Sequence, residues 1–139
     1  MAEQAYRLEQ QVGYLLRLAN QRHSAIFQAH TLNGLTAQQF AALVRIGGEG
    51  EVSQNRLGRL AAMDVATIKG VVDRLRDKGL TRSAPDPNDK RRTLISLSDE
   101  GRALLERMTD VAREITRKTL EPLSEAEQVR LLDLLERLT

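Results

Sequence analysis

Residues 84–97 read APDPNDKRRTLISL: a turn rich in proline and aspartate, three adjacent cations, and then alternating apolar positions. The alternation over residues 93–97 predicts a β-strand, and residues 80–84 on the other side of the turn can form its antiparallel partner. The stretch is therefore expected to be a β-hairpin whose loop carries the densest positive charge of the chain. A solvated hairpin tip needs no such run of cations, which makes this loop a candidate contact surface.

A helix-turn-helix is predicted directly before the hairpin. Ser53 is a good N-cap for a helix that reaches Ala61, and Asp64 is a good N-cap for the next helix. Because so few residues separate the two helices, they must cross rather than run on. Gly79 supplies the residue that ends the second helix. The buried face of that helix is predicted from the helical spacing of Ile68, Val71, Val72 and Leu75.

The rest of the chain is predicted to be helical. Capping boxes at Thr36 and Ser124 mark two helix starts, and Pro122 ends a long helix that Ser98 caps. In the first helix the apolar spacing breaks at residues 20–24. The predicted helices outside the helix-turn-helix cover residues 6–30, 36–46, 98–121 and 124–138.

The predicted fold class is mainly α with a small β-hairpin, in a single folding unit of residues 1–139. Residues 35–97 form a winged helix-turn-helix, with 85–92 as the wing, and residues 6–32 and 98–139 form a helical dimerisation region. A homodimer is expected because the last helix has too many leucines for one face of a surface helix. The alternative is that the outer helices close the core of a monomer. The leucines in question are Leu131, Leu132, Leu134, Leu135 and Leu138.

The charge is unevenly distributed, although the formal net charge is only +2. Residues 53–92 hold ten Lys and Arg against five Asp and Glu, whereas the remainder holds eleven against fourteen. The pattern indicates that residues 53–92 form a basic functional segment, while the segments that flank it are neutral or acidic.

Several classes of function are not expected. The chain has no cysteine, its histidines are His23 and His30 alone, and no Gly-rich phosphate loop or catalytic triad spacing is present. An enzyme, a metal site and a cofactor are therefore not predicted. No apolar run approaches the roughly 20 residues of a membrane span, and the N-terminus lacks the pattern of a signal peptide. The protein is expected in the cytoplasm, without a membrane partner.

Three motifs occur in an order that resembles the MarR family of bacterial winged-helix transcription regulators. Residues 57–67, LGRLAAMDVAT, look like the entry into the family's recognition helix, and residues 72–80, VDRLRDKGL, look like its end. The wing signature is matched by DPNDKRR at 86–92 followed by LSDEG at 97–101. The resemblance implies a dimeric, sequence-specific DNA-binding regulator, a repressor that a small ligand releases from a palindromic operator.

The chain also resembles one branch of this family, which represses the catabolism of aromatic or N-heteroaromatic acids. The resemblance rests on residues 12–23, VGYLLRLANQRH, with SQN at 53–55 and MD at 63–64. It implies a small aromatic or N-heteroaromatic acid, or a thioester of one, as effector. The recognition helix departs from the family pattern, because Val65 and Lys69-Gly70 stand where an Arg and a Thr-Arg pair are frequent. Base readout is therefore expected to differ from that of better-known members.

Side chains for DNA contact are predicted on the helix-turn-helix. A helix of about 15 residues fits the major groove, where base edges carry a full donor and acceptor code, and Thr67 and Lys69 are expected there. Arg74 is expected at a phosphate. For each residue the alternative is a solvated surface side chain. Phosphate contacts are also predicted at the exposed start of the preceding helix, from Ser53, Gln54 and Asn55.

The wing is predicted to enter the minor groove. Arg91 occupies the position that does so in the resembling family, and the flanking Lys90 and Arg92 are expected at phosphates. Asp89 can accept a hydrogen bond from Arg91 and hold it extended, which would explain an acid inside a DNA-binding loop. The alternative is a solvated tip.

An effector site is predicted on the first helix. In the resembling family the ligand pocket lies between the dimerisation helices and the winged helix. Arg17, Asn20 and His23 recur at i, i+3 and i+6, share a broad face, and could meet a carboxylate. The alternative is that His23 is an interhelical hydrogen-bonding residue and Arg17 a surface cation.

Two other functions remain open. The protein can be a repressor that responds to no ligand, or a winged helix used only for protein contacts. The second function would require an apolar exposed face on the recognition helix and an uncharged wing, and the sequence predicts neither.

Overall fold

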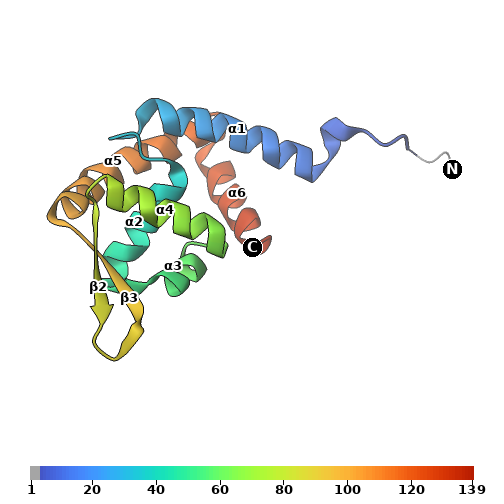
Figure 1. The fold of residues 1–139 in the computed structure, drawn as a ribbon. Coiled ribbons are helices and arrows are strands. Elements are labelled where there is room, and N and C mark those ends of the chain that lie inside the picture. Colours follow the sequence, from blue (N-terminus) through green and yellow to red (C-terminus); the bar gives the residue numbers. More distant parts are fainter. Residues whose placement is uncertain (1–3) are drawn as a thin grey trace. The chain divides into compact units, whose positions relative to one another are not determined.

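The computed structural model describes residues 4–139 (Figure 1). The contacts between these residues divide them into two compact units. One unit holds the chain up to His30 together with Arg113–Thr139, and the other is Thr31–Ala112. The predicted single unit covered residues 1–139, of which residues 1–3 lie outside the described range. Within residues 4–139, no helix combines the length and apolar character that a bilayer crossing requires.

The unit Thr31–Ala112 is a winged helix, as predicted. Its helices are α2 (Ala37–Glu49), α3 (Gln54–Leu60), α4 (Val65–Asp77) and the first part of α5 (Asp99–Leu120). The predicted caps are present: Thr36 forms a capping box, and Ser53 Oγ accepts from the backbone N–H of Arg56 at 3.3 Å. Asp64 Oδ1 accepts from the backbone N–H of Thr67 at 2.7 Å. The predicted inner face of α4 is buried at Ile68, Val71, Val72 and Leu75.

The first part of α5 belongs to the winged helix and not to the outer helices. Thr31 Oγ1 lies 3.8 Å from Met108 Sδ, and a Cβ built on Gly47 of α2 would lie 2.7 Å from Leu105 Cδ2. The boundary between the two units therefore falls inside α5, after Ala112, whereas the sequence predicted it before residue 98. A continuous helical pattern carries no mark of the point at which its packing partners change.

The sheet consists of β1 (Val52–Ser53), β2 (Thr81–Asp86) and β3 (Asp89–Leu97), all antiparallel, in the order β1-β3-β2. The hairpin is longer than predicted, because the ladder reaches Asp86 and Asp89 and leaves a turn of only two residues. Residues 85–92 are thus the outer end of a hairpin and not a loop. Pro85 is compatible with β2 because an edge strand can turn the missing N–H to solvent. The register shifts directly after it.

The end of α4, the hairpin and the start of α5 meet at Ser98. Its Oγ donates to the carbonyl oxygen of Gly79 at 2.6 Å and accepts from the backbone N–H of Gly101 at 3.0 Å. Its backbone N–H donates to the carbonyl oxygen of Leu80, also at 3.0 Å. A Cβ on Gly101 would lie 2.0 Å from that same carbonyl oxygen, so only glycine fits this position.

The other unit contains η1 (Leu8–Gln10), α1 (Val12–His30), the rest of α5, and α6 (Glu125–Arg137). The predicted helix start at residue 6 is wrong, since α1 begins at Val12. The helix is continuous through residues 20–24, where the apolar spacing breaks. Polar side chains occupy this stretch because they bond to the end of α5. Arg22 donates to two of its last carbonyl oxygens, and His23 Nδ1 lies 2.9 Å from Thr119 Oγ1.

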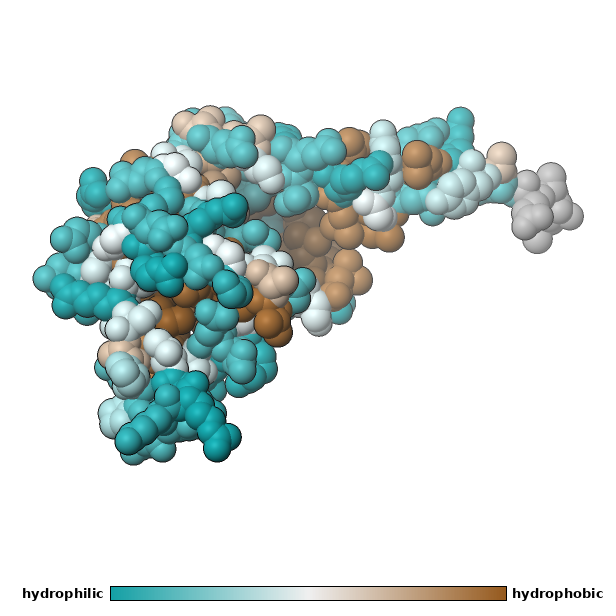
Figure 2. Space-filling model, viewed as in Figure 1, coloured by the Kyte–Doolittle hydropathy of each residue, from teal (hydrophilic) through white to brown (hydrophobic). Residues whose placement is uncertain are grey.

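Large apolar side chains lie exposed along α1 and α6, where they gather in Figure 2. No residue of α6 is buried in the single chain. Val129 is 70% exposed and Leu138 is 69% exposed. An apolar surface of this kind is typical of a protein interface, which favours the predicted homodimer over a closed monomer core. The exposed members are Val12, Leu15, Leu16, Leu18, Val129, Leu132, Leu134 and Leu138.

The close packing around Ser98 predicts that one methyl group added at Gly101 destabilises the protein. Gly101→Ala should lower the free energy of unfolding by about 1–3 kcal/mol, because the new Cβ overlaps the Leu80 carbonyl oxygen and the backbone must move. Chemical denaturation measures the change. Gly48→Ala in α2 is the matched control, since a Cβ there meets no atom within 4 Å and should cost nothing. Equal stability of the two variants would contradict this description of the junction.

Candidate functional site

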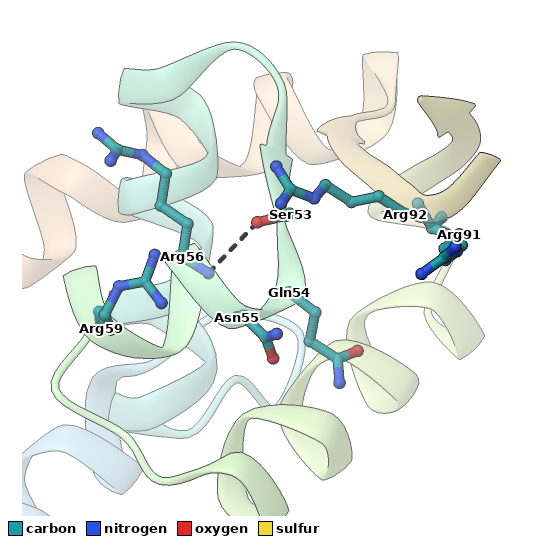
Figure 3. Close-up of a pocket in the computed structure, with 8 residues that line it drawn as sticks. Ser53, Gln54, Asn55, Arg56, Arg59, Arg91 and Arg92 are labelled. Carbon is teal, nitrogen blue, oxygen red and sulfur yellow. Dashed lines mark hydrogen bonds between the residues drawn. The ribbon is translucent and has the colours of Figure 1, made fainter. Parts of the chain in front are cut away.

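A cavity of about 540 Å³ opens between the start of α3 and residues 91–93 of β3 (Figure 3). It brings together five of the residues that the sequence predicted for DNA contact. Three further lining residues were not predicted, although Arg56 and Arg59 stand three apart in the basic segment and could have been found from that spacing. The lining consists of Ser53, Gln54, Asn55, Arg56, Arg59, Arg91, Arg92 and Thr93.

The pairing of β1 with β3 explains why these residues meet. Ser53 is the Cα partner of Leu94, so the residues that follow Ser53 lie beside those that precede Leu94. The start of α3 is thereby held against the base of the hairpin. A strand of two residues has no periodicity, which is why the sequence predicted both groups of residues but not their contact.

The cavity carries positive charge that the protein itself does not neutralise. Arg56 Nε lies 3.2 Å from Glu49 Oε2. Within residues 4–139, no carboxylate lies at ion-pair distance from Arg59, Arg91 or Arg92. In Figure 3, Arg59 lies on α3, and Arg91 and Arg92 lie on the hairpin at the opposite side of the cavity. A polar cavity with three such guanidinium groups is suited to an anion, and guanidinium matches the geometry of a phosphate.

The acids at the hairpin tip bond to the backbone and not to the cations. Asp86 Oδ1 accepts from the backbone N–H of Asn88 at 2.9 Å, and Asp89 Oδ1 accepts from the backbone N–H of Arg91 at 3.0 Å. Asp89 was predicted to hold Arg91, and it does so through the main chain. Both carboxylates therefore shape the turn, as aspartates commonly do, and leave the Arg91 guanidinium available. Lys90 is exposed on the same hairpin but does not line the cavity.

Two of the three residues predicted on α4 have partners within the helix. Thr67 is half-buried, and its backbone N–H bonds Asp64. Lys69 Nζ lies 3.2 Å from Asp73 Oδ2, so it must leave this exposed ion pair to reach another group. Arg74 is exposed. The Thr67 backbone N–H, together with its hydroxyl, holds the pKa of Asp64 below the ordinary value of 3.8, so the cap is ionised at neutral pH.

A second cavity, of about 350 Å³, lies in the other unit between α1, α5 and α6. Asn20 and His23 line it, as predicted for an effector site, whereas Arg17 lies outside it with its guanidinium carbon 5.5 Å from the centre of the Tyr14 ring. The bond between His23 and Thr119 corresponds to the interhelical alternative, yet both side chains still face the cavity. The remaining lining is mostly apolar: Leu16, Ala19, Thr116, Leu120, Leu131, Leu132 and Leu135.

Comparison with known proteins finds relatives that are described as transcriptional regulators. Residues 35–93 match the family model described as MarR family. The HTH-type transcriptional repressor NicR of Pseudomonas putida is 40% identical over 134 residues, which cover 96% of this chain and 85% of NicR.

Two solved structures are similar over nearly their whole length. A probable transcriptional regulator from Pseudomonas aeruginosa is 56% identical, with a TM-score of 0.93 over 96% of this chain and 100% of that chain. The Bordetella bronchiseptica protein BpsR, whose DNA binding is regulated by 6-hydroxynicotinic acid, is 40% identical, with a TM-score of 0.91 over 97% of each chain.

The charge on Asp64 predicts a dependence of stability on pH. Since the folded-state pKa is lowered, the charged cap stabilises the fold above the unfolded-state pKa, and this contribution is lost as the pH falls through the folded-state value. Asp64→Ser keeps a capping oxygen without an ionisable group. Between about pH 7 and about pH 2.5, the wild type should lose more free energy of unfolding than this variant, as measured by chemical denaturation. Equal losses would show that the cap is not an ionised carboxylate.

Proposed function

Because this chain belongs to the MarR family, we propose that it is a homodimeric transcriptional repressor that binds a palindromic operator and leaves it when a small aromatic or N-heteroaromatic acid binds. The family resemblance and the winged-helix fold predicted from the sequence are confirmed. Members of the family are transcriptional regulators and not enzymes. The observation that carries the proposal is the cavity in which residues 53–55 meet Arg91 and Arg92, which have no carboxylate of residues 4–139 at ion-pair distance.

The cavity and the hairpin tip supply the contacts to the DNA backbone. Guanidinium groups without acidic partners bind phosphates and release the counterions that surround DNA, so the affinity for operator falls as salt increases. Arg91, at the outer part of the wing, enters the minor groove, where a narrow A·T-rich sequence enhances the negative potential. The backbone contact from Asp89 presents Arg91 without pairing with its guanidinium.

The recognition helix α4 supplies the contacts to bases. Its outward side carries Thr67, Lys69 and Arg74. In a helix-turn-helix the N-terminal part of this helix lies in the major groove, where sequence is read. A two-fold dimer formed through the exposed apolar faces of α1 and α6 would present two such helices to half-sites ~10 bp apart, hence a palindrome.

The cavity lined by Asn20 and His23 is the proposed effector site. Its volume of about 350 Å³ and its apolar walls suit a small flat ring, and its few polar groups can orient a carboxylate. The likeness to NicR and to BpsR, which responds to 6-hydroxynicotinic acid, supports this class of ligand. Release requires that the ligand bind more tightly to a geometry of the dimer that does not fit DNA.

A winged helix used only for protein contacts is the competing function. It would require an uncharged wing, and the wing exposes Lys90, Arg91 and Arg92. The first turn of α4 does expose Val65 and Ala66, although the sequence predicted no apolar exposed face on this helix. The apolar area is nevertheless only two side chains wide, too small for a specific protein interface. Since a repressor acts on DNA in the bacterial cell, we place the protein in the cytoplasm.

Removal of the wing arginine tests DNA binding. Arg91→Ala should weaken binding to an operator, selected from random DNA by the wild-type protein, by at least about tenfold, because a charge-assisted contact is lost in each half-site. Fluorescence anisotropy at two salt concentrations measures the affinity, and size-exclusion chromatography confirms that the dimer persists. Arg82→Ala is the matched control, since Arg82 lies on the same hairpin, 3.8 Å from Asp99 and outside the cavity. Equal affinity of wild type and Arg91→Ala would refute the role of the wing.

The effector site is tested with a panel of aromatic acids that includes benzoate, nicotinate and 6-hydroxynicotinate. One of them should release the wild-type protein from its operator. Asn20→Ala should require about tenfold more of that acid, because a hydrogen bond to a charged group is lost, while affinity for DNA without ligand is unchanged.

The comparison variant is Arg17→Ala, whose side chain lies outside the cavity and should not alter the response. A stronger effect of Arg17→Ala than of Asn20→Ala would move the effector site away from this cavity. No response to any acid would leave the protein a ligand-independent repressor.

A further inference from the structure

The first turn of α4 exposes an apolar side chain without a folding reason. Val65, the first residue of the helix, is 72% exposed, and Ala66 beside it is also exposed. A β-branched residue is a poor helix former, and exposure of its methyl groups to water brings no stability. The side chain is therefore available to a partner outside the chain.

Gly70 gives a second and independent observation, on the face of the helix that carries Ala66. It lies one turn after Ala66, and a Cβ built on it would meet no atom of the described residues 4–139 within 4 Å. Packing against a neighbouring helix therefore does not explain this glycine, which costs about 1 kcal/mol relative to alanine within a helix. The open space on this face admits a partner that comes close to the backbone of α4.

We propose that Val65 reads thymine, by packing its methyl groups against the C5-methyl group of a thymine in the major groove, while the open surface at Gly70 lets α4 approach the bases. The inference rests on the proposed function. The N-terminal residues of a recognition helix are those that reach base edges. In the major groove the thymine methyl is the apolar group that distinguishes A·T from the other pairs.

The chemistry around Val65 agrees with DNA as the partner. Exposed cations follow on the same helix at Lys69 and Arg74, and on the hairpin at Arg91, all in the same compact unit. Phosphates would meet these cations while the base edge meets the valine. The two exposed apolar side chains, Val65 and Ala66, fall far short of the area of a protein interface.

The test replaces thymine by deoxyuridine, which removes only the C5-methyl group. An operator selected from random DNA by the wild-type protein is synthesised with one deoxyuridine at a time, and affinities are measured by fluorescence anisotropy. We expect one thymine in each half-site at which the replacement weakens wild-type binding about fourfold, the effect of one buried methyl group. Val65→Ala should bind the two forms equally. Because Val65 is exposed, this variant should fold as the wild type does.

Val44→Ala is the matched control. Val44 is a valine of α2, 41% exposed in the same unit and outside the recognition helix, so this variant should keep the full sensitivity to deoxyuridine. If the wild-type protein selects an operator but no deoxyuridine weakens binding, or if Val65→Ala remains equally sensitive, the thymine contact is wrong and the proposed repressor stands. If the wild-type protein selects no sequence at all, the proposed function fails together with it.

Discussion

The winged helix depends on the contact between Gly101 and the carbonyl oxygen of Leu80. No side chain fits between these two segments, since a Cβ would come within 2.0 Å of that oxygen. The adjoining Ser98 bonds Gly79, Leu80 and Gly101 at once. One small region thereby fixes the end of α4, the residue directly before the hairpin and the start of α5. The direction in which the wing leaves the recognition helix follows from this region.

The proposed DNA-binding surface depends on a second, smaller pairing, between β1 and β3. Two residues of β1 bond to β3 and bring the start of α3 to the base of the wing. Arg91 and Arg92 then share a cavity with Ser53, Gln54 and Asn55, residues that lie almost forty positions earlier in the chain. Acids close to these arginines, Asp86 and Asp89, are occupied by backbone N–H groups of the turn. The two aspartates thus stabilise the turn, and the arginines remain available to an anion.

Local signals in the sequence predicted most of the secondary structure. Capping residues at Thr36, Ser53, Asp64 and Ser124 act within one helical turn, and each is found bonded as its position implies. The signals failed where structure depends on distant partners. The wing strands extend past Pro85 because an edge strand tolerates it. The first helix is continuous through residues 20–24, as predicted, but the sequence did not show that Arg22 and His23 there bond to the end of α5.

The sequence by itself determined the order of the elements, the buried face of α4, the basic middle of the chain and the family, because caps, periodicity and motifs are local properties. Only the tertiary structure decided what these residues contact. In the folded chain Asp89 accepts a hydrogen bond from the backbone N–H of Arg91, and His23 bonds to Thr119. Arg56 and Arg59 line the cavity, and Val65 is exposed. Apart from the turn contact of Asp89, these features depend on residues far apart in the chain or on which atoms remain uncovered, and a local sequence pattern shows neither.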